Sequence, residues 1–346
     1  MSNKLIAFCA LLTGCLPTFE TVEEACDGKV PGGKNASDEA VDALARVSCY
    51  RRLAKLTRAR IEPRLQEASE AHNLYTRAQA TEEALASWNG FFTEEPGQPF
   101  FTGETVYDRA EAAGYPNATA GGLSVWQYEY LDGQQATDRI DFWFPDPDVR
   151  QSYLQLSWVG GAYAAGPSDH VSTTQMANME IFYQIPVLDH AGVPVVYPVD
   201  GQQDVHRSYE PVDPNSFGYG LGELGYPITV TVGGTTHSGG DNPHQISVNQ
   251  ATLTGPDGDI TLLTATPSDH PFLRYTVAFV PEVPLEANTE YTFFAELSWV
   301  DQPNRKVESI FTTGSEPSPH SFARIGANDL PRRPTIRHWV WEPAQP

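Results

Sequence analysis

The first part of the chain carries apolar residues at the spacing of amphipathic helices. From Val41 onward they recur every three or four positions, and Ser37 stands before them as an N-cap residue. A second pattern of this kind follows Pro63, and a third runs from residue 106 to residue 113, where Gly114 ends it. We therefore expect the first part of the chain to be mainly helical.

Short extended runs follow the helical patterns. Residues 154–163 and 176–185 are rich in aromatic, Ile and Val residues and predict strands. From Pro186 to Gly314 short alternating runs recur between turns of Gly, Pro, Asn and Asp, which is typical of a β-sandwich. The strands expected there are Ile228–Val232, Ala251–Leu253, Ile260–Thr264, Arg274–Phe279, Glu290–Leu297 and Lys306–Thr312.

The order of helices first and strands later predicts the α+β class and divides the chain into five parts. Residues 1–14 are expected to be a signal peptide and residues 15–36 a linker. Residues 37–186 form the first expected domain and residues 187–314 a second, all-β domain. Residues 315–346 are rich in Pro, Arg and Trp and are expected to be an irregular tail, whose role the sequence does not indicate.

The N-terminus has the layout of an export signal. Lys4 precedes the apolar run Leu5–Leu12, which is too short to span a bilayer. The letters LTGC at residues 12–15 resemble a bacterial lipobox, in which the cysteine becomes the lipid-bearing first residue of the mature chain. Leu16 follows Cys15, and by resemblance to lipoproteins of diderm bacteria this favours the outer membrane. The alternative is an ordinary secretory signal with a chance cysteine.

The cysteine count agrees with export. Cys9 leaves with the signal and Cys15 carries the lipid, so that Cys26 and Cys49 remain as an even pair in an oxidising compartment. We expect them to form a disulfide between the N-terminal segment and the first helix, and two free thiols are the alternative. No CxxC spacing occurs, so a cysteine-bound metal is not expected.

The charge restricts the partners. The formal net charge is −22, and such a surface repels nucleic acid and anionic lipid. Neither a Gly-rich phosphate loop nor a standard metal-binding spacing is present in the sequence. We therefore predict no nucleic-acid partner and no cofactor.

Three blocks of residues occur along the expected first domain. Residues 52–72 include the letters IEPRL and end in an Ala-His pair. Residues 93–115 contain the strings TEEP, FTG, DRA and AAGY, and residues 146–150 read DPDVR. In order and spacing they resemble the CAP superfamily of secreted proteins (cysteine-rich secretory proteins, antigen 5, pathogenesis-related 1). The resemblance implies a three-layer α/β/α sandwich over residues 37–186.

The resemblance also implies a cleft lined by two His and two Glu, which often bind a divalent metal. His72 stands at the first His position and Glu94 at one Glu position. Phe92 and Val149 stand where the family has His, and residues 121–124 offer no carboxylate. One imidazole and one carboxylate would make a weak metal site. We therefore predict no catalytic residue and no bound metal. His72 and Glu94 are the two residues of the cleft that remain as candidates for a site. The alternative is that His72 is an ordinary helix histidine and Glu94 an ordinary loop carboxylate.

The second domain has a resemblance of its own. Residues 198–205 read PVDGQQDV, residues 284–292 read PLEANTEYT, and residues 311–314 read FTTG. These strings resemble bacterial Ig-like domains of cell-surface proteins, which serve as spacers and adhesion modules. The resemblance implies an Ig-like β-sandwich over residues 187–314.

These inferences predict an exported protein, attached to the bacterial cell envelope by an acyl lipid on Cys15. Its expected role is that of a non-catalytic binding or adhesion module, whose ligand is a protein, a glycan or a lipid. The first alternative is a divergent metal-dependent hydrolase that uses His72 and Glu94. The second is a carrier of lipid or sterol, an activity that the CAP resemblance implies.

Overall fold

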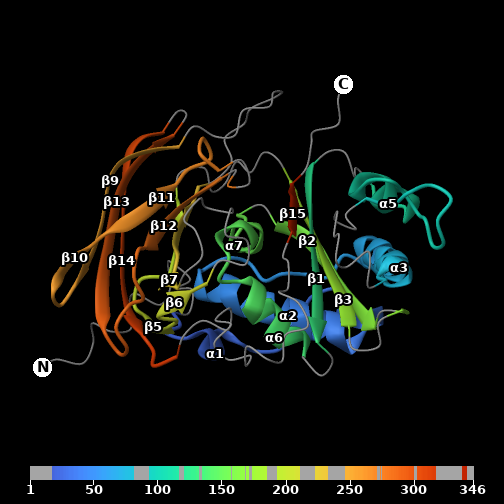
Figure 1. The fold of residues 1–346 in the computed structure, drawn as a ribbon, viewed down its shortest axis with the longest axis horizontal. Coiled ribbons are helices and arrows are strands. Elements are labelled where there is room, and N and C mark those ends of the chain that lie inside the picture. The colour runs from blue at the N-terminus through green and yellow to red at the C-terminus, as the bar shows by residue number, and fades with distance from the viewer. Residues whose placement is uncertain are drawn as a thin grey trace, which may run out of the picture.

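The protein's structure is a computed structural model (Figure 1). It describes residues 18–81, 93–116, 121–131, 135–156, 158–167, 169–170, 174–184, 193–210, 223–232, 246–270, 273, 275–299, 302–316 and 337–340. Two parts lie along the longest axis: a sheet with helices on both faces, and a pair of packed sheets. The predicted α+β class is confirmed.

Local signals place the helices of the first part. Helix α2 (Asp38–Leu53) begins where the Oγ of Ser37 accepts a hydrogen bond from the N–H of Ala40, which confirms the predicted N-cap. Helix α3 (Pro63–Gln79) begins at a proline, whose missing N–H costs nothing in the first turn. Helix α5 (Val106–Ala112) begins with a capping box between Thr105 and Asp108. The remaining helices are α1 (Val22–Ala25), the 3-10 turn η2 (Gly33–Asn35), α6 (Ala136–Trp143) and α7 (Pro147–Tyr153).

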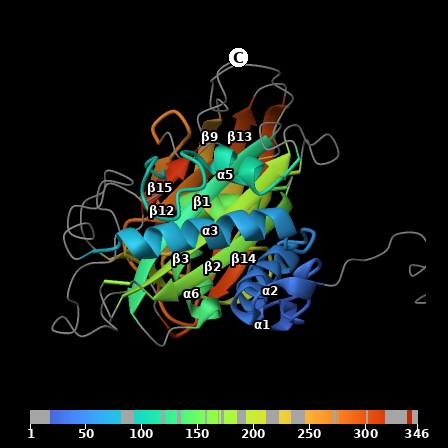
Figure 2. The ribbon, with the colours of Figure 1, turned by 90° about the vertical axis from the view of Figure 1, so that its right-hand side faces the viewer.

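The sheet of the first part is four-stranded and antiparallel, with the order β15-β1-β3-β2. Its strands are β1 (Gly121–Leu131), β2 (Trp158–Pro167), β3 (Thr174–Gln184) and β15 (Arg337–Val340). Helices α3 and α5 cover one face, and α2, α6 and α7 lie on the other, so that the first part has three layers (Figures 1 and 2).

The edge strand β15 comes from the predicted irregular tail. Its residues pair with β1 from Ser124↔Val340 to Gln127↔Arg337. Residues 337–340 therefore return to the first sheet after the chain has passed through the second part.

The second part contains two packed sheets, as the short alternating runs predicted. One has the order β10-β9-β13-β14-β5, the other β11-β12-β8-β4, and β6 and β7 form a two-stranded ribbon. The strands are β4 (Val195–Tyr197), β5 (Gln202–Val205), β6 (Ser208–Tyr209), β7 (Leu224–Gly225), β8 (Ile228–Thr231), β9 (Ser247–Gly255), β10 (Gly258–Ile260), β11 (Leu262–Ala265), β12 (Thr276–Pro281), β13 (Glu290–Trp299) and β14 (Gln302–Thr313). Strand β13 alternates between buried and less buried residues along its whole length, because one face packs on the other sheet.

One hydrophobic core joins the two parts. Tyr50 of α2 stacks on Phe144, with ring centroids 3.6 Å apart, and Phe144 meets Tyr197 of β4 edge to face at 4.8 Å. Residues of both parts belong to the same buried cluster. The β-sandwich therefore packs directly on the α2 and α7 side of the first part.

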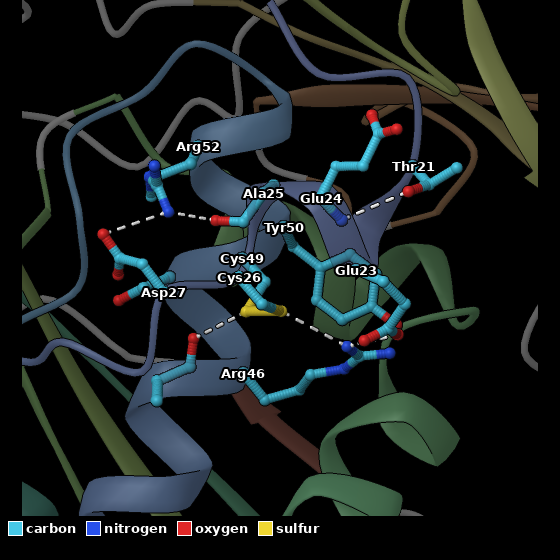
Figure 3. Close-up of a disulfide and its surroundings, with 12 residues drawn as sticks. Thr21, Glu23, Glu24, Ala25, Cys26, Asp27, Arg46, Cys49, Tyr50 and Arg52 are labelled. Carbon is cyan, nitrogen blue, oxygen red and sulfur yellow. Dashed lines mark hydrogen bonds and ion pairs between the residues drawn. A yellow bond between two sulfur atoms is a disulfide. The ribbon is translucent and has the colours of Figure 1, made fainter. Parts of the chain in front are cut away.

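Cys26 and Cys49 form a disulfide, with an S–S distance of 2.07 Å, as predicted (Figure 3). It joins the residue after α1 to the C-terminal half of α2. Within the residues that the structure describes, no helix has the length and apolar character needed to cross a membrane.

Candidate functional site

Helix α3 turns a row of polar side chains toward the sheet. Gln66, Ser69, His72, Asn73 and Thr76 recur at the helical spacing of three and four, and all are buried. The side-chain amide of Gln66 accepts from the backbone N–H of Tyr163 and donates to its carbonyl, as a neighbouring strand would. Gln66 thus joins the polar face of α3 to strand β2 by hydrogen bonds across the layer.

His72 and Glu94, the two residual candidates of the CAP resemblance, lie against each other. The Nδ1 of His72 is 2.9 Å from Oε1 of Glu94, and both side chains are 0% exposed. The Tyr75 ring lies parallel to the His72 ring at 6.3 Å, and its hydroxyl accepts a hydrogen bond from the N–H of Glu95. The sequence named these two residues separately, and the structure brings them together.

Donors surround the carboxylate of Glu94. Its Oε2 accepts from the N–H groups of Thr102 and Gly103, and Nε of Arg109 is 3.8 Å from Oε1. Burial alone would raise the pKa of Glu94, but the hydrogen bonds from His72 and Thr102 and the charges of His72 and Arg109 outweigh it. The pKa of Glu94 is therefore below its ordinary value, and the group is ionised at neutral pH.

Because Glu94 is ionised, it determines which ring nitrogen of His72 carries a hydrogen. The carboxylate of Glu94 can only accept, so the Nδ1 of His72 carries the hydrogen of the bond between them. The pair connects α3 to the loop that leads into α5. Among the described residues, no group of three or more His, Cys, Asp or Glu side chains is placed to hold a metal ion.

Val149, at another tetrad position of the resemblance, lies elsewhere in the molecule. Its side chain is fully buried in the shared core, on helix α7. Phe92 lies outside the described residues, and the side chains of residues 121–124 are not described. Cys15 also lies outside the described residues.

Arg150, the neighbour of Val149, enters the contact with the sandwich. Its guanidinium donates to three carbonyl oxygens and lies over three aromatic rings, with its Cζ 4.8–5.2 Å from the ring centroids. The carbonyls belong to Phe144, Pro145 and Pro227, and the rings to Phe144, Tyr197 and Tyr226. Pro227, Tyr197 and Tyr226 come from the second part, so α7 is a joint between the two parts.

Two buried carboxyl groups lie at the start of α7. Asp146 caps the helix through the N–H of Asp148, at 2.8 Å, and accepts a hydrogen bond from the hydroxyl of Tyr209 at 3.0 Å. Burial raises the pKa of Asp146 despite these bonds. Burial, followed by repulsion from Asp146, raises the pKa of Asp148 well above its ordinary value.

His270 packs against Asp148 from the turn between β11 and β12, with Nδ1 3.6 Å from Oδ1. That distance would suit an ion pair, but burial lowers the pKa of His270 to about 4 and favours the uncharged form of both partners. Both shifts oppose an ion pair between Asp148 and His270. No local pattern in the sequence connects the turn at Asp269 and His270 to α7.

Comparison of the chain with protein-family models and with curated proteins finds no match. Function is therefore inferred from the residues of this chain and from their geometry.

Proposed function

We propose that this protein is exported, attached to the cell envelope by a lipid on Cys15, and binds a partner there without catalysis. The observation that carries the non-catalytic part is the closed pair of His72 and Glu94. Both side chains are 0% exposed, and Glu94 uses both oxygens on donors of the protein itself. A nucleophile, base or metal ligand must reach its substrate or ion, and these two groups serve the fold instead.

The contacts of helix α7 support the same proposal. In the CAP resemblance this block supplies a histidine to the cleft, whereas here Val149 is in the core and Arg150 joins the two parts. The three layers of the first part support a CAP-like sandwich over residues 37–186, and the paired sheets support an Ig-like sandwich over residues 187–314. The shared core makes the two parts one body, which suits a spacer or display module.

Export is supported by the sequence and by the disulfide. The signal-like segment and the lipobox resemblance precede Cys15, and the bond between Cys26 and Cys49 needs an oxidising compartment. With a net charge of −22, the surface suits a solvated envelope protein and repels nucleic acid.

The test of the non-catalytic proposal is metal analysis of the purified protein after incubation with zinc. We expect no stoichiometric zinc in the wild-type protein and none in His72→Ala. The exposed His170→Ala is the matched control for a histidine in contact with the same helix. Stoichiometric zinc that is lost in His72→Ala and kept in His170→Ala would overturn the proposal.

The second candidate is a metal-dependent hydrolase, favoured by the 2.9 Å contact between His72 and Glu94. A carboxylate that fixes the tautomer of a histidine is a common arrangement at metal and catalytic sites. This candidate requires the pair to open to solvent. Hydrogen exchange at the N–H groups of Thr102 and Gly103, which bond Glu94, measures that opening.

A further inference from the structure

Residues 19–27 are fastened to the body of the protein at several places. The disulfide holds Cys26 to α2, and Arg52 of that helix donates to the carbonyl of Ala25 (Figure 3). Asp27 forms ion pairs with Arg52, at 3.2 Å, and with Arg58. Residues 25–27 therefore have a fixed place on α2.

The start of the same segment is held at a second place, by the β-sandwich. The carbonyl of Glu20 accepts a hydrogen bond from the N–H of Gln203, in β5, at 2.7 Å. The ring of Phe19 lies 4.8 Å from the guanidinium carbon of Arg52. Phe19 thus contacts α2, and Glu20 contacts the start of β5, next to the turn at Gly201.

Only residues 16–18 separate Cys15 from Phe19. Four residue steps of extended chain span at most roughly 14 Å. A compact protein of this length has a radius of gyration of about 20 Å, and hence a diameter of about 50 Å. The tether is therefore much shorter than the body that it holds.

Building on the proposed lipid anchor, we propose that this short tether holds α1 and the turn before β5 against the bilayer surface. Helix α5 and the loop before it then point away from the membrane. Both views place α1 at the lower edge of the molecule and α5 in its upper half (Figures 1 and 2). The partner of the α1 side is the headgroup region of the membrane that carries the lipid.

Charge does not produce this orientation. Glu20, Glu23, Glu24 and Asp27 are exposed around the tether, and the chain carries a net charge of −22. Anionic headgroups repel such a face, so the length of the tether must hold it near the membrane.

The orientation decides the environment of two exposed aromatic side chains. Phe100 is 53% exposed and Phe101 is 38% exposed. They precede Thr102 and Gly103, whose N–H groups hold the loop to Glu94. The two rings are therefore presented to the compartment on the far side, and do not enter the membrane that anchors the protein.

Single-cysteine labelling of the lipidated full chain tests this. Cys26 and Cys49 are bonded and Cys15 carries the lipid, so an introduced cysteine is the one reactive thiol of the mature chain. Ile310→Cys puts a fluorophore beside the turn before β5, because the carbonyl of Ile310 accepts from the N–H of Gly201. Phe100→Cys puts it on the far loop.

The labelled proteins are bound to vesicles of phosphatidylethanolamine and phosphatidylglycerol that carry a quencher on the headgroups. We expect quenching to be several-fold stronger at residue 310 than at residue 100. Equal quenching at the two sites, or stronger quenching at residue 100, would overturn the inference.

A flexible Gly/Ser insertion between Pro17 and Thr18 is the control for the tether. We expect it to remove the difference between the two labels, and a difference that survives the insertion would contradict the tether as its cause. Vesicle flotation of the wild type and of Cys15→Ser separates this inference from the proposed function. If the wild type does not float, the lipid anchor itself is wrong; if it floats with the reverse quenching pattern, only the orientation is wrong.

Discussion

Glu94 and Asp148 are both buried carboxyl groups, yet their pKa values move in opposite directions. Burial penalises the charged form of each. Glu94 faces two backbone N–H groups, a histidine and Arg109, which together outweigh the penalty. Asp148 faces the carboxyl of Asp146, whose repulsion adds to the cost of ionising Asp148.

The comparison separates two ways of keeping a polar group inside a protein. The pair of His72 and Glu94 keeps a charge and surrounds it with donors. At α7, burial raises the pKa of both carboxyl groups, and the charge of Arg150 is stabilised by carbonyl oxygens and aromatic rings. The first arrangement should be sensitive to the loss of charge, and the second to the loss of donors.

The largest expected effect comes from Arg150→Met, which keeps the length of the side chain and removes its donors. Three carbonyl oxygens lose their bonds at a buried interface, so we expect a loss of at least about 3 kcal/mol in the free energy of unfolding. Urea unfolding measures it. Arg64→Met, which breaks an exposed ion pair with Glu67, should cost less than about 1 kcal/mol. Equal losses in the two variants would mean that α7 is not a joint.

Next in size is Glu94→Gln, which removes the charge and keeps the shape. Hydrogen bonds to a charged group are worth about 1.5–3 kcal/mol, so we expect a loss of about 2 kcal/mol at neutral pH. Glu95→Gln, at the exposed neighbour, should change the free energy of unfolding by less than about 0.5 kcal/mol. If Glu94→Gln lost no more stability than Glu95→Gln, the charge of Glu94 would not contribute to the stability of the fold.

Much of the fold follows from local signals. Ser37 and Pro63 mark the starts of α2 and α3, and the alternating run around β13 marks a half-buried strand. These features depend on neighbours in sequence, and a periodic pattern records them directly.

The joint and the last strand could not be predicted in this way. Asp148 meets His270, and β15 meets β1, across more than a hundred residues. The local sequence around Asp269 and His270 predicts only a turn. His270 is buried because the sandwich packs on α7. The contact of His72 with Glu94 lies between these cases, because the resemblance named both residues but the sequence supplied no geometry.

Asp148→Asn separates the neutral joint from a charged one. Because the folded pKa of Asp148 is raised, its contribution to stability is present below the ordinary value of 3.8 and is lost as pH rises through the folded pKa. The amide does not ionise, so the variant should gain stability relative to the wild type as pH rises. Thermal melts across pH measure this, with exposed Asp257→Asn as the control. A variant that loses stability as pH rises would show that Asp148 is an ionised partner of His270.

The smallest effect is expected from His270→Gln, at acid pH alone. The folded pKa of His270 is lowered from 6.5 to about 4, so the neutral ring contributes stability above pH 6.5 that is lost as pH falls through about 4. Glutamine does not take up a proton, so the variant should lose less stability than the wild type across this window. Glu94 also makes both proteins lose stability as pH falls, because its folded pKa is below its ordinary value of 4.5. The difference between the two melting curves therefore belongs to His270. His170→Gln, at an exposed histidine, should leave the curve unchanged, and a parallel shift in both variants would mean that burial in the joint is not the cause.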